Sequence, residues 1–348
     1  MVRHGGFARA AALSGIAALI LTAAGCAATA PEPAPSPTVP VYVSTYETPA
    51  PTELAPLRGT TVPAGSLAHS AIAAKVDNHW DARPQVGLES TDIVYEELVE
   101  GGITRYVAIW QSTIPELLGP VRSIRPMDPD IAAPYGGIIA YSGGQQRFVN
   151  LMQATPVYNA IHGMGDTANT FFRTDSKRAP HNVLVKATEV VAQHADIPAP
   201  AQQWAYSLDA ASSSAAKEGA PVSAIHYRFS NMFDGSWTYD PDSQTYLRIQ
   251  QGSADLDSSG NQLRASNVVV LRVGVVDDQG VPKTLLEGSG EAWISTGGGT
   301  IHGTWSKASQ TEPLQFTDDR GFGIRLGAGN TWVELVPTRG SVEFTAAG

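Results

Sequence analysis

The spacing of hydrophobic residues changes several times along the 348-residue chain. Between residues 64 and 200, short apolar runs typical of buried strands alternate with helical stretches at about 145–154 and 188–194. From 222 to 348, short strands follow one another at regular spacing, with glycine-rich turns between them. We therefore predict an α+β fold: an N-terminal mixed α/β layered domain (64–200), an Ala- and Ser-rich boundary segment (201–221) and a smaller, mostly β domain (222–348), built as a sandwich, curled sheet or open barrel.

The first 25 residues have the pattern of a signal peptide. Arg3 and Arg9 accompany an apolar run over 10–21, which is shorter than the roughly 20 residues of a membrane-spanning helix. Small residues then lead to Cys26, the only cysteine, in a context that resembles the bacterial lipobox. We expect Cys26 to be lipidated and to anchor the chain to the cell membrane on its extracytoplasmic face. The alternative is an ordinary secretory signal followed by an unrelated cysteine.

A proline-rich tether is predicted from residue 26 to residue 63. Nine prolines between 31 and 63 are separated mainly by small and polar residues. Such a composition lacks the apolar surface needed to offset ordering and favours extended conformations, which here reach on the order of 100 Å. The apolar group at 39–46 interrupts this pattern and could instead form a short strand or dock on the folded part.

Composition excludes several classes of function. With 23 basic and 33 acidic residues, the net charge is −10, which disfavours sequence-independent nucleic-acid binding. A single cysteine excludes an intramolecular disulfide. The eight histidines lack the spacing of a zinc motif, and no Gly-x-Ser-x-Gly or phosphate-binding loop motif occurs, so we expect no metal and no cofactor.

A hairpin is predicted around residues 100–102. Strand-like runs at 92–99 and 103–111 flank a Gly-Gly pair, which suits a tight turn. A two-residue Gly101-Gly102 loop would place Leu98 opposite Arg105, with Glu96 and Glu100 diagonal to that arginine and Glu97 on the other face. A structural ion pair explains such an arrangement as well as a binding site does.

Donor groups for an anion recur in the same domain. Arg122 and Arg125 lie in a loop bounded by prolines, and a predicted strand at 137–141 runs through a Ser-Gly-Gly turn into a helix, an arrangement that can hold an anion on backbone N–H groups. The glycines could equally serve the turn alone. The candidate ligand-binding residues are Arg83, Arg105, Arg122, Arg125, Ser142, Gly143, Gly144, Arg173, Arg178, His181 and Asn182, and the candidate acids for any catalysis are Asp77, Glu97 and Asp175.

Several longer motifs resemble the YerB-type family of bacterial lipoproteins, a domain-of-unknown-function family with N- and C-terminal parts. The motifs are Val76-Asp77-Asn78, the runs at 82–88, 92–97 and 100–105, the run at 119–126, Ser142-Gly143-Gly144, Phe172-Arg173 and the run at 179–182. This resemblance implies an anchored envelope protein of two domains and brings no established activity. A weaker likeness, in the order of a hairpin arginine, an arginine loop and a glycine-rich turn, links the chain to the LytR–CpsA–Psr glycopolymer transferases.

Three functions remain open from the sequence. The first is binding of a phosphate- or carboxylate-bearing envelope ligand by an arginine-lined cleft. The second is a non-catalytic adaptor that docks another envelope protein, and the third is glycopolymer or phosphoryl transfer. An adaptor is favoured if Arg105, Arg122 and Arg125 each pair with a carboxylate and no cleft is open.

Overall fold

The computed structural model describes residues 42–347. The predicted signal peptide, Cys26 and the first part of the predicted tether (26–41) lie outside the described residues. The described residues from Ala50 onward group into one compact unit. Within the described range, no helix combines the length and the apolar character that crossing a membrane requires.

The folded unit begins earlier than predicted. Strands β1 (Thr52–Leu54) and β2 (Thr61–Pro63) form an antiparallel hairpin inside the segment assigned to the tether. The residues between these strands pack against the folded unit: Ala55 and Leu57 are each only 1% exposed, and Leu57 belongs to a core cluster. The tether prediction is therefore wrong from about residue 50 onward, because two apolar residues among the prolines are enough to dock this stretch.

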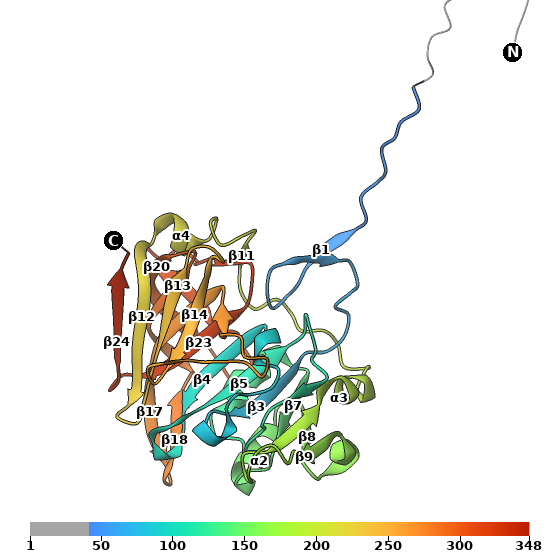
Figure 1. Cartoon of the computed structure of the whole chain (residues 1–348), viewed down its shortest axis with the longest axis vertical. Coiled ribbons are helices and arrows are strands. Elements are labelled where there is room, and N and C mark those ends of the chain that lie inside the picture. Colours follow the sequence, from blue (N-terminus) through green and yellow to red (C-terminus); the bar gives the residue numbers. More distant parts are fainter. Residues whose placement is uncertain (1–41, 348) are drawn as a thin grey trace, which may run out of the picture. The chain divides into compact units, whose positions relative to one another are not determined.

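A mixed central sheet carries the N-terminal part (Figure 1). Its strands lie in the order β8-β7-β3-β5-β4, with β3 parallel to β7 and antiparallel to β5. Every position of β3, β4 and β5 is buried, as expected for strands covered on both faces. The bounds are β3 Ile72–Asp77, β4 Ile93–Leu98, β5 Thr104–Trp110, β7 Ile138–Tyr141 and β8 Tyr158–Ile161.

The same sheet continues into the C-terminal part. Strand β23 (Thr331–Pro337) lies parallel to β4 on one side and parallel to β17 (Asn267–Asp278) on the other. Beyond β17 the antiparallel order is β19 (Gly288–Thr296), β20 (Gly299–Lys307) and β21 (Gln315–Asp318), while β18 (Val281–Leu285) pairs with the far end of β17. The two predicted parts thus share one hydrogen-bonded sheet.

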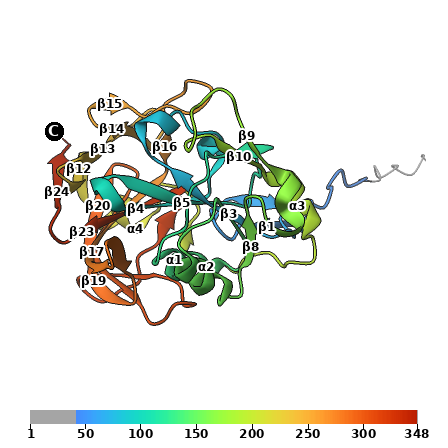
Figure 2. The same ribbon diagram turned by 90° about the horizontal axis from the view of Figure 1, so that it is seen from below.

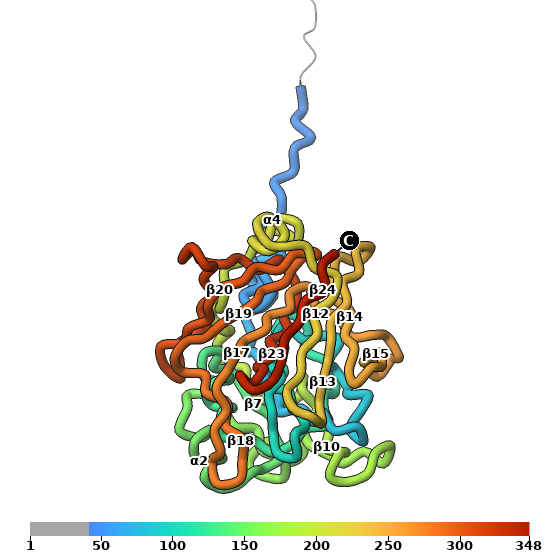
Figure 3. The backbone as a smooth tube through the Cα atoms, turned by 90° about the vertical axis from the view of Figure 1, so that its left-hand side faces the viewer, coloured from blue at the N-terminus to red at the C-terminus, as the bar shows by residue number. Residues whose placement is uncertain are grey.

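A second, antiparallel sheet packs against this one. It has the order β24-β12-β13-β14, and these strands lie side by side in Figure 3. Alternating burial along β12 and β14 marks a sheet with one covered face. That face meets β4, β5 and β23 through a cluster that includes Trp237, Tyr246, Tyr106 and Trp332. The bounds are β12 Ala220–Ser230, β13 Phe233–Asp240, β14 Thr245–Gln250, β24 Ser341–Ala346, and the short β15 Ser253–Ala254 and β16 Arg264–Ala265.

A buried arginine joins the two sheets. Nη2 of Arg248 on β14 donates to Glu96 on β4 at 2.7 Å, and its Nη1 donates to Glu334 on β23 at 3.0 Å. The guanidinium also lies over the ring of Trp332, 4.5 Å from its centroid. Because these three charged side chains are fully buried, they are a fixed part of the core.

Helices cover both faces of the central sheet (Figure 2). Residues of α1 (Asp128–Ala132) and α2 (Gln146–Gln153) belong to one core cluster, and α3 (Ala187–Gln193) packs into the other, together with a small sheet β6-β10-β9. Helices α2 and α3 confirm the stretches predicted at 145–154 and 188–194. The remaining bounds are β6 Leu117–Leu118, β9 Phe171–Arg173, β10 Val183–Lys186, β11 Tyr206–Ser207, α4 Ser214–Glu218 and β22 Leu326–Gly327, with single 3-10 turns at Trp80–Ala82, Leu88–Ser90, Glu100–Gly102, Ala133–Tyr135 and Gly165–Thr170.

The register of the β4–β5 hairpin differs from the prediction by one residue. Leu98 faces Thr104, and Glu97 faces Arg105. The loop has three residues, Glu100-Gly101-Gly102, because the N–H of Val99 donates to the carbonyl of Ile103 at 2.9 Å and both glycines have positive φ. A slip of one residue exchanges the faces of a strand. Glu96 therefore points to Arg248, and the predicted pairing of Glu96 with Arg105 is wrong.

Candidate functional site

Asp77, the last residue of β3, organises one end of the central sheet. Its Oδ2 lies 2.6 Å from Nδ1 of His181 and 3.1 Å from Nε of Arg122. Its Oδ1 accepts a hydrogen bond from the backbone N–H of His79 at 3.2 Å. The N–H of Asp77 donates to the carbonyl of Pro120, and this hydrogen bond holds the loop of residues 119–126 beside the end of β3. Asp77 is 1% exposed, so its partners are essentially all within the protein.

Three guanidinium groups meet at the loop of residues 119–126, which we call the arginine loop. Nη1 of Arg105 on β5 and Nη1 of Arg125 both donate to the carbonyl oxygen of Ser123, at 3.0 and 3.2 Å. Nε of Arg125 donates to Glu100 at 2.7 Å, while Arg122 pairs with Asp77. We name Arg105, Arg122 and Arg125 the arginine cluster. Arg122 and Arg125 each form an ion pair with a carboxylate, whereas Arg105 forms no ion pair with any carboxylate among residues 42–347.

The arginine cluster is electrostatically unbalanced. Burial, and then the positive charges of Arg125 and Arg122, lower the pKa of Arg105 to about 10. Nε of Arg105 and Nε of Arg122 are buried without an aligned hydrogen bond. Glu100 responds in the opposite sense: burial, the largest single influence, favours its neutral form, but the hydrogen bond from Arg125 together with the charges of Arg125 and Arg105 lowers its pKa. Unused donors and excess positive charge favour a negatively charged ligand at this position.

A fully buried acid–base trio lies beneath the cluster. Nζ of Lys75 contacts Glu97 and lies 2.7 Å from Oδ1 of Asp128, whose Oδ2 accepts from the N–H of Arg125 at 2.6 Å. Burial, and then the charge of Asp128, raise the pKa of Glu97 to about 8. Glu97, one of the candidate acids, is therefore enclosed in the core and supports the arginine loop from below.

The predicted Ser-Gly-Gly turn lies against the arginine loop. The N–H of Ser142 donates to the carbonyl of Arg122, and the carbonyl of Gly143 accepts from the N–H of Ile124, both at 3.0 Å. A Cβ on Gly144 would come within 2.9 Å of the side chain of Ile124, so the close approach needs glycine. Oγ of Ser142 is 3.1 Å from Nδ1 of His162. The structure thus joins the predicted turn and the predicted arginines in one site.

The other predicted residues have separate surroundings. Nη1 of Arg173 donates to Oδ1 of Asn182 at 2.7 Å, and the Nδ2 of Asn182 closes the loop by donating to Thr174. Arg83 donates to Asn78 and Gln251 and lines a cavity of about 430 Å³ with residues of the β14–β16 region. Arg178 and Asp175 are exposed, and within the described residues their side chains form no hydrogen bond or ion pair.

Two residues near Asp77 escaped the sequence prediction. The imidazole of His79 stacks on that of His181, with ring centroids 4.3 Å apart, and Asp81 lies beside them. His79 and Asp81 follow β3 at alternate positions after Asp77, which is the one signal in the sequence that could have suggested them. Nothing in the spacing indicates that His181 returns to this point.

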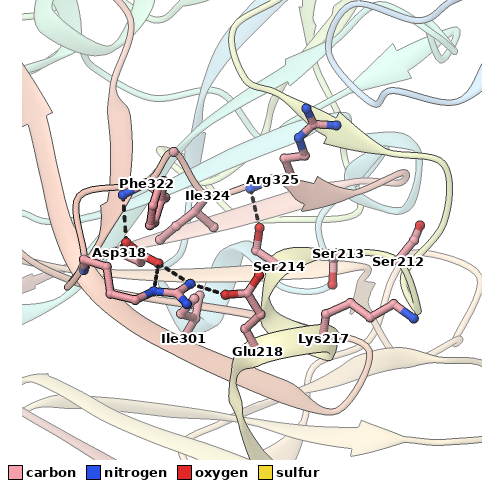
Figure 4. Close-up of a pocket in the computed structure, with 12 residues that line it drawn as sticks. Ser212, Ser213, Ser214, Lys217, Glu218, Ile301, Asp318, Phe322, Ile324 and Arg325 are labelled. Carbon is pink, nitrogen blue, oxygen red and sulfur yellow. Dashed lines mark hydrogen bonds and ion pairs between the residues drawn. The ribbon is translucent and has the colours of Figure 1, made fainter.

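A further cavity of about 460 Å³ lies in the C-terminal part, between α4 and the segment after β21 (Figure 4). Arg320 is the one lining cation that forms ion pairs there among the described residues, and the exposed side chains of Lys217 and Arg325 form none. Arg320 pairs with Glu218 and, at 2.7 Å, with Asp318, and the backbone N–H of Arg325 donates to Oγ of Ser214. The cations of this cavity are exposed to solvent, with the side chain of Arg320 at 59%, whereas Arg105 is 6% exposed and lacks a counter-ion, so we take the arginine cluster as the better candidate for ligand binding.

The fold and the site define an α+β protein whose N-terminal part carries an arginine cluster and whose C-terminal part completes the central sheet. Comparison with models of known protein families identifies the family to which this α+β protein belongs. The chain belongs to the family described as "Protein of unknown function (DUF3048)": the N-terminal domain model matches residues 57–198 and the C-terminal domain model matches 224–333. This confirms the family resemblance drawn from the motifs.

Two comparisons describe the same relative. The chain is 26% identical over 297 residues to the Bacillus subtilis (strain 168) protein named "Putative lipoprotein YerB", covering 81% of this chain and 86% of the relative. It also resembles the crystal structure of YerB from Bacillus subtilis, with a TM-score of 0.72, 24% identity, and coverage of 84% of this chain and 99% of that one. The structural match confirms the α+β fold.

Proposed function

We propose that the chain is a membrane-anchored lipoprotein that binds an oxyanion, such as a phosphate or a carboxylate, at the arginine cluster on the extracytoplasmic side. The anchoring is supported by the lipobox-like context of Cys26 and by the lipoprotein name of the Bacillus subtilis relative. Both arguments concern the location of the protein. The binding argument rests on the site alone.

The observation that carries the binding proposal is the environment of Arg105. This side chain is 6% exposed, has no carboxylate partner in residues 42–347 and lies close enough to Arg122 and Arg125 for their charges to lower its pKa. Burying a cation without a counter-ion is costly. A bound oxyanion would supply the missing negative charge and would accept from the unused Nε donor of Arg105.

The exposures of the partners indicate the direction of approach. The side chains of Arg122 and Glu100 are 21% and 37% exposed, whereas Arg125 is 11% exposed. A ligand would therefore enter beside Arg122 and reach Arg105 last. Two of the three arginines pair with carboxylates and one does not, so the first condition for the adaptor hypothesis is not met. The second condition concerns an open cleft, and neither of the two cavities described above is lined by an arginine of the cluster.

The test measures binding of simple anions by the full chain, purified in a non-ionic detergent. Isothermal titration with inorganic phosphate, inorganic pyrophosphate and citrate separates a phosphate site from a carboxylate site. We expect one of these anions to bind at one equivalent, and Arg122→Gln to abolish the heat. Arg339→Gln, an exposed arginine in the turn after β23, removes the same charge and should bind like wild type. Absence of binding by the wild type, or equal loss in both variants, would refute the proposal.

A further inference from the structure

We infer that His79, Asp81 and His181 form a binding site for a divalent transition-metal ion, with Zn²⁺ the best match. Each of the three residues offers a ligand atom, and these atoms all lie within 4.8 Å of one another. Two imidazoles and one carboxylate are a ligand set that suits zinc and its neighbours rather than calcium or magnesium, which prefer oxygen alone.

The buried carboxylate of Asp77 prepares His181 for this role. A hydrogen bond of 2.6 Å between Nδ1 of His181 and Asp77 holds the proton on Nδ1. The lone pair is then on Nε2, which makes no hydrogen bond to any residue in the described range. Metal-binding histidines characteristically donate their second nitrogen to a carboxylate in this way, which fixes the ring and strengthens the ligand. Its ring stacks on that of His79, and because an imidazole binds an ion in its own plane, one ring must rotate out of the stack for both to reach the same ion.

The lone pair on Nδ1 of His79 is used by the backbone N–H of Asp81, and an ion bound at this atom would replace that hydrogen bond. Nδ1 of His79 accepts a long hydrogen bond of 3.2 Å from the backbone N–H of Asp81, and lies 3.7 Å from Oδ2 of the same residue. Two ligands about 2.1 Å from a tetrahedral ion are separated by about 3.4 Å, so a small side-chain movement brings both onto one ion.

The position of His79, Asp81 and His181 suits a functional ion rather than a structural one. Three protein ligands leave a fourth position open on a tetrahedral ion. The side chain of Asp81 is 57% exposed, whereas those of His79 and His181 are 18% and 14% exposed, so the site is reached from solvent at its carboxylate edge. Because Asp77 contacts both His181 and Arg122, the ion would lie close to the arginine cluster, but this inference does not depend on anion binding.

The experiment uses the full chain in detergent, stripped with a chelator and then titrated with ZnCl₂ alone in a phosphate-free buffer. We expect one equivalent of Zn²⁺ to bind, and Co²⁺ to give the absorption bands of a tetrahedral ion. Asp81→Asn changes an exposed side chain and should weaken binding about tenfold or more, while Asp196→Asn, an exposed aspartate of α3's following loop, should not. His181→Ala should abolish the bands, and His226→Ala, an exposed histidine on β12, should preserve them.

A second histidine needs its own control. His302 lies between Glu291 and Asp319 on the surface, and these three side chains could also bind Zn²⁺. If His302→Ala removes one equivalent of bound Zn²⁺, that ion was bound at His302 and not at His79 and His181. The inference is overturned if wild type binds no Zn²⁺, or if Asp81→Asn and His181→Ala, when folded, bind it as wild type does. Anion titration in the presence of chelator separates this outcome from failure of the arginine cluster.

Discussion

The carboxylate of Asp77 lies 2.6 Å from Nδ1 of His181, although 104 residues separate the two in sequence. The same oxygen is 3.1 Å from Nε of Arg122. One buried side chain at the end of β3 therefore ties the arginine loop and the loop before β10 to the central sheet. Its loss should affect both loops together.

Replacing this carboxylate should cost stability. We expect Asp77→Asn to lower the free energy of unfolding by about 2 kcal/mol, because two charge-assisted contacts are lost and the amide cannot accept on both sides. Urea unfolding measures the change. Asp196→Asn, which removes an exposed carboxylate without partners, serves as the control. Equal stability of the two variants would contradict the role of Asp77 described above.

Glu97 should make stability depend on pH. Its pKa is raised to about 8, so between the ordinary glutamate value and pH 8 the folded state holds a proton that the unfolded state releases. Stability therefore falls as the pH rises through this window. Glu97→Gln is neutral at every pH and should gain stability relative to wild type between pH 5 and pH 8. The exposed Glu116→Gln should show no such trend; the same slope in both variants would rule out this assignment.

The buried arginine between the sheets should be sensitive to substitution. Arg248→Met leaves Glu96 and Glu334 in the core without their cation, and we expect a loss of about 3–5 kcal/mol in the free energy of unfolding. Arg228→Met, on strand β12 of the same sheet but exposed, should change stability by less than about 0.5 kcal/mol. A small effect at Arg248 would mean that the acids are neutral or solvated in the variant.

Lipidation can be tested at the single cysteine. If Cys26 carries the anchor, Cys26→Ser should move the protein from the membrane fraction to the soluble fraction and abolish incorporation of labelled fatty acid. Ser44→Ala, in the segment before the folded unit, should leave both unchanged. Continued labelling of Cys26→Ser would place the acyl group elsewhere.

Local patterns in the sequence were sufficient for most elements of the fold. Helix α2 and strand β7 were predicted because apolar spacing, glycine and flanking polar residues agree there. The hairpin was located correctly, but its register was not, because Glu100-Gly101-Gly102 allows either a two- or a three-residue loop. The buried Glu96–Arg248 contact shows which register the tertiary structure selects.

Long-range contacts account for what the sequence could not predict. The arginines at 105, 122 and 125 were expected together, and the structure brings them together because Ser123 accepts from two of them. The stacking of His79 on His181 depends on how the loop before β10 returns to β3, and no periodicity in the chain records that return. Similarly, the pairing of β4 with β23 joins segments that lie at opposite ends of the folded part.

The pairing of β4 with β23 affects how the chain folds during its synthesis. The central sheet has a vacant place beside β4 until residues 331–337 have left the ribosome, so the early half of the chain must wait for the last strands before its core is complete. During that interval Glu96 lies next to an open edge, and Arg248 lacks its second acid, Glu334, which β23 supplies. Nascent chains halted near residue 330 should therefore be easily digested, whereas those released beyond 346 should resist a protease.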